Sequence, residues 1–263
     1  MRRVAILAAS RRELAPAREA LEEIQRGRLG SFRHEMGRAG RVEAHLIETG
    51  MGPESAFAAA QAALSELVVD AVVTTGYAGA LGPAGVGELI LGTEILNWTK
   101  DHSQARFRTD PVLMAIAREA VGRARAAWSQ GAVVTVENVV WRAVEKHALG
   151  KVSGAIAVDM ESATIALAAA TVGVPFLLVR AVSDRADEDL PMDFNLWCTP
   201  WGRVRGITQL LTRPRILRSL LQMKRHVEQG SQILGRFFRA FLVMLDEGHV
   251  PGEGLALATL GKC

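Results

Sequence analysis

Short apolar runs alternate with alanine-rich stretches of helical periodicity over the first 190 residues of the chain. The apolar runs, each expected to form a buried strand, cover residues 4–9, 41–52, 70–81 (ending in a glycine-rich loop), 88–96, 131–141 and 175–184. Apolar residues at helical spacing fill residues 12–24, 53–67, 110–127 and 162–174. This alternation predicts an α/β protein of three layers, with helices on both sides of a central mixed sheet.

The chain beyond residue 195 follows a different pattern, which predicts a helical C-terminal extension. Leucine and phenylalanine residues recur at helical spacing between residues 217 and 245, after a break at Pro214. Nine Lys or Arg and a single acid, Glu228, lie between residues 203 and 239. We therefore divide the chain into a main domain (1–195), a basic amphipathic helical extension (196–247) and a tail (248–263).

Two interpretations of the extension are open. Its apolar face can pack into the core or into an interface between subunits, which is the more common use of such a helix. A basic helix rich in Phe and Leu can also lie on an anionic membrane surface. Nucleic-acid binding is not expected, because no recognition motif accompanies the charge.

Composition places the chain among cytoplasmic globular proteins, with peripheral contact to the inner membrane face as the alternative that the extension raises. Hydrophobic residues make up 49% and charged residues 22% of the 263 positions. No apolar run reaches the roughly 18–20 residues that span a bilayer. Cys198 and Cys263 have no metal or disulfide spacing, and the six histidines are scattered, so no metal site is expected.

Carboxylates at the ends of buried elements are the first candidates for chemistry. Asp159 and Glu161 stand at the start of one apolar helix, and Ser183 and Asp184 end the last apolar strand. Burying a carboxylate costs several kcal/mol unless it is paired. Ligands of open α/β sheets bind beyond the carboxyl ends of strands, so these acids mark a site. An acid such as Glu161 in a first helical turn can, however, serve only as a cap.

Several motifs resemble the nucleoside phosphorylase superfamily, specifically its 5′-methylthioadenosine/S-adenosylhomocysteine nucleosidase-like branch, over roughly residues 4–190. The most specific are "VDMESA" and, about twenty residues later, "VRAVSDRAD". Weaker matches are "AASRREL", "ETGMG", "TTGYAGAL" and "TVENVVW". The resemblance implies an enzyme that cleaves the N-glycosidic bond of a 5′-substituted adenosine, releases adenine and needs neither cofactor nor metal. It also implies a homo-oligomer.

The resemblance assigns two catalytic residues. Asp184, oriented by Ser183, is the general acid that protonates the leaving base, and Glu13 activates the attacking water. Positive charge builds on the sugar in such a reaction, as in other glycoside cleavages. The substrate contacts it implies are Met160 and Glu161 at the ribose, Gly76, Tyr77 and Ala78 in the glycine loop, and Val139, Val140 and Trp141 at the purine.

Two departures from the family pattern leave alternatives open. Tyr77 stands where the family usually has serine, so the nucleophile can be phosphate instead of water, with Arg11, Arg12 and Arg180 as candidate phosphate ligands. The basic extension, with "VDMES" and "DRADEDLP", resembles the hopanoid-associated nucleoside phosphorylase group, which acts on adenosylhopane. A non-catalytic nucleoside-binding or membrane-associated module, and a regulatory protein that uses the basic extension, are the competing classes.

Overall fold

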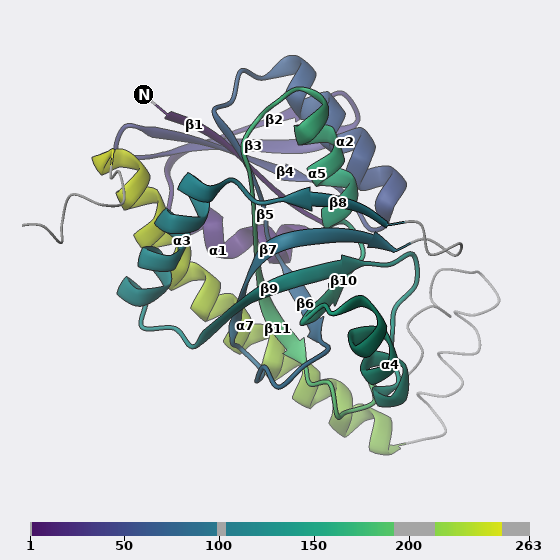
Figure 1. Ribbon diagram of the computed structural model, residues 1–263. Helices are drawn as coiled ribbons and strands as arrows, with labels where there is room; N and C mark the ends of the chain where they lie inside the picture. The colour runs from purple at the N-terminus through teal and green to yellow at the C-terminus, as the bar shows by residue number, and fades with distance from the viewer. Residues whose placement is uncertain (1, 99–103, 192–213, 249–263) are drawn as a thin grey trace, which may run out of the picture.

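A computed structural model describes residues 2–98, 104–191 and 214–248 (Figure 1). Its strands are β1 (Arg2–Ala8), β2 (Glu22–Leu29), β3 (Phe32–Ala39), β4 (Val42–Glu48), β5 (Ala71–Thr74), β6 (Tyr77–Ala80), β7 (Leu89–Trp98), β8 (Gln104–Arg108), β9 (Trp128–Thr135), β10 (Ala157–Asp159) and β11 (Phe176–Asp184). Its helices are α1 (Arg11–Arg18), α2 (Pro53–Glu66), α3 (Pro111–Arg123), α4 (Ala143–Ser153), α5 (Ser162–Thr171) and α7 (Pro214–Glu247).

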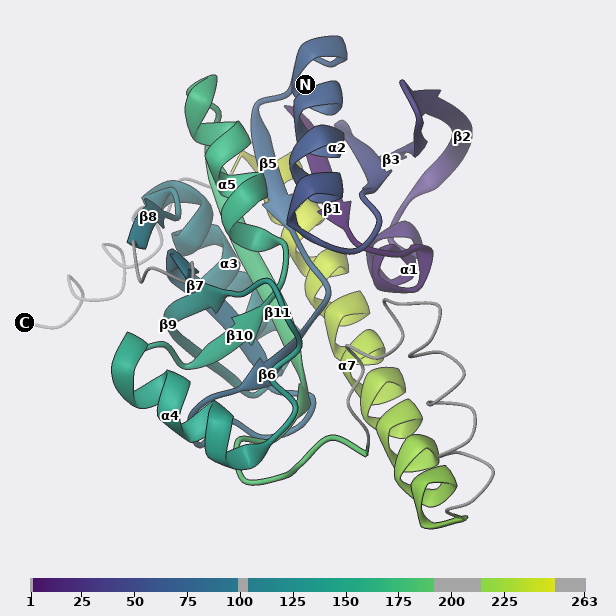
Figure 2. The ribbon, with the colours of Figure 1, turned by 90° about the vertical axis from the view of Figure 1, so that its right-hand side faces the viewer.

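The described strands form one mixed sheet between two helical layers, as the alternating pattern predicts. The strand order is β2-β3-β4-β1-β5-β11-β6-β10-β9-β7-β8. Helices α1, α3 and α7 pack together on one face, and α2 packs with α5 on the other (Figures 1 and 2). The predicted three-layer fold class is confirmed.

Strand β11 is the centre of the sheet. All nine of its residues are buried, and it pairs with β5, β6 and β7, so that the second half of the sheet closes on itself. A strand covered on both faces has to be almost entirely apolar. The three polar residues that β11 does carry, Arg180, Ser183 and Asp184, therefore need partners inside the protein.

The carboxy-terminal half of α7 belongs to the main core. Its side chains from Leu234 to Leu245 include Phe237, Phe238 and Phe241, all three fully buried, with the rings of Phe237 and Phe241 stacked at 5.3 Å. They share one core with β1, β4, α1 and α3. The apolar face of this half of α7 is thus core packing, the first of the two interpretations. The predicted domain boundary at 195 lies outside the described residues.

Three segments differ from the sequence-based expectations. The helix expected over 12–24 ends at Arg18, because the chain turns at residues 19–21 into β2, where Ile24 packs against Gly37 of β3. Residues 77–80, expected in a loop, form β6 against β11. The strand expected over 131–141 ends at Thr135, and helix α4 follows at 143, with Gly154 ending it in the left-handed conformation.

Within the described ranges, no helix is at once long enough and apolar enough to cross a membrane.

Candidate active site

Glu13, Gly76 and Arg180 meet at the end of strand β1, although they come from distant parts of the chain. Ser10 caps α1 and donates its hydroxyl to Glu13 Oε2 at 2.9 Å, which fixes the carboxylate. A Cβ on Gly76 would lie 2.5 Å from both Glu13 Oε1 and Arg180 Nη1, and the φ of Gly76 is +133°. Only glycine leaves room here for the Glu13 carboxylate and the Arg180 guanidinium to approach the same segment of backbone.

Arg180 is held by Asp159, the first acid of the "VDMESA" motif. The Arg180 side chain is 1% exposed, and its Nη2 lies 2.8 Å from Asp159 Oδ2. Arg180 Nη1 donates to the carbonyl of Thr75 at 2.7 Å, while the Thr135 hydroxyl donates to Asp159 Oδ1 at 2.7 Å. Arg180 Nε, in contrast, has no hydrogen-bond partner among the described residues. Asp159 therefore neutralises a buried arginine.

Glu161 lies beside this pair but does not cap its helix. It occupies the N-cap position of α5 without any side-chain cap bond, and instead accepts the backbone N–H of Gly52 at 3.1 Å. Burial raises the pKa of Glu161 to about 7, with Arg180 lowering it and the neighbouring carboxylates of Asp159 and Glu13 raising it further. Glu161 is 8% exposed, and its carboxylate takes the Gly52 N–H rather than a donor of its own helix.

Asp184 accepts hydrogen bonds on both of its oxygens. The hydroxyl of Ser183 donates to Oδ1 at 2.6 Å, and the Lys146 ammonium lies 2.5 Å from Oδ2. Gly79 faces the same carboxylate, since a Cβ there would lie 3.0 Å from Oδ2. Ser183 orients Asp184 in the manner that the sequence resemblance implies, and Lys146 adds a charge that was not expected.

Lys146 was missed by sequence reasoning. Its side chain is fully buried, and Nζ also donates to the carbonyls of Arg185 at 2.8 Å and Glu188 at 2.9 Å. The ammonium thus uses all three of its donors and ties α4 to the loop after β11. Nothing in "AVEKHALGKVS" distinguishes Lys146 from the exposed Lys151, so the sequence carries no signal for it.

The two clusters lie along one stretch of backbone. Gly76 marks the Glu13 end and Gly79 the Asp184 end, three residues apart at β6, so that the ends are separated by roughly 10 Å at about 3.3 Å per residue. Beyond Asp184 a cavity of about 270 Å³ opens between the loop of residues 188–191 and α7, which contributes Met223 and His226. The predicted acids therefore line neighbouring positions at one edge of the sheet.

Ala78 and Met160 are sequence neighbours of the site residues in β6 and after β10, whereas the Tyr77 ring points toward α7. Ala78 is buried in β6, and Met160 is partly buried between Asp159 and Glu161. The Tyr77 ring lies so close to Gly230 that a Cβ there would be 3.2 Å from Tyr77 Cε1. Its pKa is raised by burial, and a hydrogen bond with Ser231 opposes that rise. The half-buried Tyr77 packs on α7, which explains how the site holds so bulky a side chain.

The predicted purine-wall residues occupy a turn after β9 and not the strand itself. Val139, Val140 and Trp141 line a separate hollow of about 400 Å³ with Trp98 and Leu149. Their link to the acids is through the backbone, because the carbonyl of Trp141 accepts the N–H of Leu190 at 2.8 Å. Leu190 in turn lines the cavity at Asp184.

Of the three candidate phosphate ligands, only Arg180 is inside the site. Arg11 and Arg12 are exposed, the Arg11 side chain to 61%. In the described part of the chain, no three His, Cys, Asp or Glu side chains are grouped as a metal ion would require.

A three-layer α/β fold with buried acids at the carboxyl ends of its central strands is typical of proteins that bind a ligand at that end of the sheet. The family model described as "Phosphorylase superfamily" matches residues 3–205, and the chain belongs to that family. The expected family and class of enzyme, the nucleosidases and nucleoside phosphorylases, are thereby confirmed.

Within this family, the chain is similar to two curated nucleosidases. The chain is 27% identical over 202 residues to the 5′-methylthioadenosine/S-adenosylhomocysteine nucleosidase of Maridesulfovibrio salexigens, covering 71% of this chain and 87% of the relative. It is 28% identical over 208 residues to the nucleosidase of the same name from Geobacillus kaustophilus, covering 73% and 88%.

Solved structures share the fold. One is the 5′-methylthioadenosine/S-adenosylhomocysteine nucleosidase of Neisseria meningitidis in complex with methylthio-immucillin-A, with a TM-score of 0.73, 24% identity and coverage of 92% of this chain and 99% of that one. A futalosine hydrolase mutant of Helicobacter pylori gives a TM-score of 0.74 at 18% identity, with the same coverage.

The Lys146–Asp184 pair gives a prediction about stability. Removing one partner of a buried ion pair leaves the other charge uncompensated and costs about 3–5 kcal/mol. We expect Lys146→Met to lower the free energy of unfolding by about that amount, and Lys146→Met/Asp184→Asn to recover most of it. Denaturant unfolding measures both, with Lys151→Met as the exposed control from the same helix. Equal losses in the single and double variants would contradict the pairing.

Proposed function

We propose that this protein cleaves the N-glycosidic bond of a 5′-substituted adenosine and releases adenine. What supports the proposal is that Glu13 lies against Gly76 and Asp184 against Gly79, two glycines three residues apart and hence separated by roughly 10 Å along the chain. A nucleoside offers two reacting groups, the base and the sugar carbon, that need an acid and a base at such a separation. The names of the curated relatives support adenosine derivatives as the substrate class.

Asp184 is the general acid for the leaving base. When the bond between C1′ and N9 breaks, its electron pair moves into the adenine, and a proton on the imidazole nitrogen N7 neutralises that charge. Asp184 relays this proton to N7 from the Lys146 ammonium, which lies 2.5 Å from Oδ2, while the Ser183 hydroxyl holds Oδ1. The cavity beyond Asp184, with Leu190 and Met223 in its wall, receives the base.

Glu161 and Met160 serve the ribose. The Glu161 carboxylate accepts hydrogen bonds from the ribose hydroxyls, and Met160 packs beneath the sugar. Glu13 takes a proton from the water that attacks C1′, where positive charge develops as the base departs. The reaction needs only these proton transfers, so it requires no cofactor.

Water is favoured over phosphate as the nucleophile. A phosphate dianion needs cations or N–H groups around it. Arg180 is the cation at the Glu13 end, and its charge is already balanced by Asp159 at 2.8 Å. Phosphorolysis stays the second candidate, because Arg180 Nε lacks a hydrogen-bond partner among the described residues.

The 5′ substituent is the finer part of the proposal. The resemblance to the hopanoid-associated group suggests a large lipid, as in adenosylhopane, with a role in hopanoid biosynthesis. In that case we expect the amino-terminal half of α7 to contact the membrane, because Leu221 is 54% exposed there and Lys224 and Arg225 are exposed beside it. The homo-oligomer also stays a prediction.

The test is adenine release from purified protein, with 5′-methylthioadenosine and a long-chain 5′-alkyl adenosine as substrates. We expect the free 5-substituted ribose as the product without phosphate, and loss of at least about 100-fold in kcat for Asp184→Asn, because general acid catalysis contributes that much. Asp187→Asn, exposed and three residues along, is the matched control. Near-normal turnover by Asp184→Asn would refute its role, and a strict need for phosphate would establish phosphorolysis.

The raised pKa of Glu161 predicts that nucleoside binding depends on pH. With a pKa of about 7, its carboxylate is lost as the pH falls through 7 and is fully present above it. We expect the Kd of adenosine, measured by calorimetry in the Asp184→Asn background to prevent cleavage, to rise by up to about tenfold per pH unit below 7. Adding Glu161→Gln should flatten this profile, whereas Glu54→Gln, an exposed acid on α2, should not. If Glu161→Gln left the pH dependence of the Kd unchanged, another group would be responsible for it and the prediction would be wrong.

A further inference from the structure

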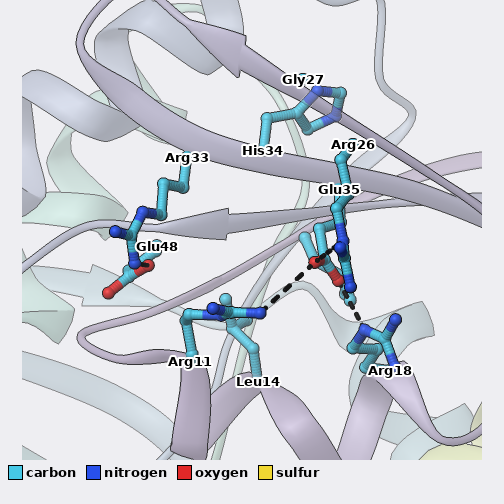
Figure 3. A pocket seen from close by; sticks show the side chains of 10 residues that line it. Arg11, Leu14, Arg18, Arg26, Gly27, Arg33, His34, Glu35 and Glu48 are labelled. Atoms are coloured by element: carbon cyan, nitrogen blue, oxygen red, sulfur yellow. Dashed lines mark hydrogen bonds and ion pairs between the residues drawn. The ribbon is translucent and has the colours of Figure 1, made fainter.

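A further cavity lies against α1 (Figure 3). Arg11, Leu14 and Arg18 are spaced at i, i+3 and i+7, so they share one face of α1. Strands β2, β3 and β4 form the other wall. The cavity measures about 290 Å³. Since Glu13 projects from a different face of the helix, this space is separate from the catalytic cleft.

Positive charge is in excess around the cavity. Glu35, 17% exposed, faces three guanidinium groups: Arg18 Nε at 2.6 Å, Arg26 Nε at 3.2 Å and Arg11 Nη2 at 3.9 Å. One carboxylate balances one of these charges, which leaves two uncompensated. The fourth arginine of the wall, Arg33, lies 3.5 Å from Glu48 and is balanced by it. Figure 3 shows Arg11, Arg18 and Arg26 around Glu35, with Arg33 beside Glu48.

His34 adds no charge to the wall at neutral pH. Burial lowers its pKa, and the neighbouring His45, whose ring stacks on it at 5.2 Å, lowers it further. The excess therefore comes from arginine alone, which stays charged at every accessible pH.

The guanidinium groups remain open to a ligand. The side chains of Arg11, Arg18 and Arg26 are 61%, 40% and 71% exposed, so donors not used by Glu35 point to solvent. Leu14 and Leu46 line the same cavity and are almost fully buried, which gives it an apolar floor. A planar fork of N–H donors forms two parallel hydrogen bonds with the oxygens of a phosphate or a carboxylate, and the two uncompensated charges match the dianion of a phosphate monoester.

We propose that this cavity binds a small phosphate-bearing molecule, with the phosphate on Arg11, Arg18 and Arg26 and an apolar or sugar part on Leu14 and Leu46. The volume admits a phosphate monoester of a small group and excludes a whole dinucleotide. The site is independent of the proposed cleavage reaction, because none of its arginines faces the catalytic acids.

The test is calorimetric titration of the full chain with inorganic phosphate and with phenyl phosphate, without any nucleoside. We expect one site per chain, tighter binding of phenyl phosphate than of phosphate, and weakening as salt is raised. Arg26→Gln should weaken binding about tenfold, since a hydrogen bond to a charged group is lost. Arg38→Gln should leave it unchanged. Arg38 is the matched control, because it lies on β3 with Arg33, is exposed and pairs at 3.9 Å with Glu23, away from the cavity.

A second arm separates a soluble phosphate from a lipid headgroup. Sedimentation with phosphatidylcholine vesicles, with and without phosphatidic acid, shows whether the anion is taken from a membrane. Binding to the acidic vesicles alone, with no calorimetric signal from phenyl phosphate, would overturn the proposal. So would phosphate binding that Arg26→Gln leaves intact, since this would place the ion elsewhere, the catalytic cleft included.

Discussion

The arrangement of the site depends on how buried charge is balanced on strand β11. This strand runs through the centre of the sheet and carries Arg180 and Asp184 in otherwise apolar surroundings. Taking one charge out of water costs several kcal/mol unless a partner meets it with good geometry. Asp159 meets Arg180 at 2.8 Å, and Lys146 meets Asp184 at 2.5 Å. The two pairs fix β10, α4 and the loop after β11 relative to the central strand.

Two other acids, Glu161 and Glu13, lie near Arg180 but form no ion pair among the described residues. Glu161 lies beside the Arg180–Asp159 pair, and its pKa is raised to about 7. Glu13 is held by a hydrogen bond from the Ser10 hydroxyl. The glycines at 76 and 79 let both groups of side chains approach the backbone of β6. The ion pairs hold the backbone in place here, and the proposed function assigns the remaining acids to the substrate.

Much of this could be predicted from the sequence, because apolar periodicity and the acid motifs are local signals. The long buried run 175–184, the helix started by Asp110 and the acids of "VDMESA" all fall where the structure has them. Lys146 could not be found, since a lysine on an exposed helix and a buried one look alike until α4 is packed against residues 185–188. The helical spacing of Leu21 and Ile24 predicts a helix that continues to residue 24, three residues into β2, and only pairing with β3 decides otherwise. The sequence leaves the role of α7 open for the same reason, as its Phe face becomes core only through contact with α1 and α3.

The central claim is that acids distant in sequence surround a single nucleoside. A crystal structure of the protein with a cleavage-resistant purine nucleoside analogue tests it most directly. The account predicts that the base nitrogen N7 lies within hydrogen-bond distance of Asp184 and that the ribose hydroxyls reach Glu161, with C1′ facing Glu13. A nucleoside bound with its sugar away from Glu161, or outside the edge between Gly76 and Gly79, would contradict it.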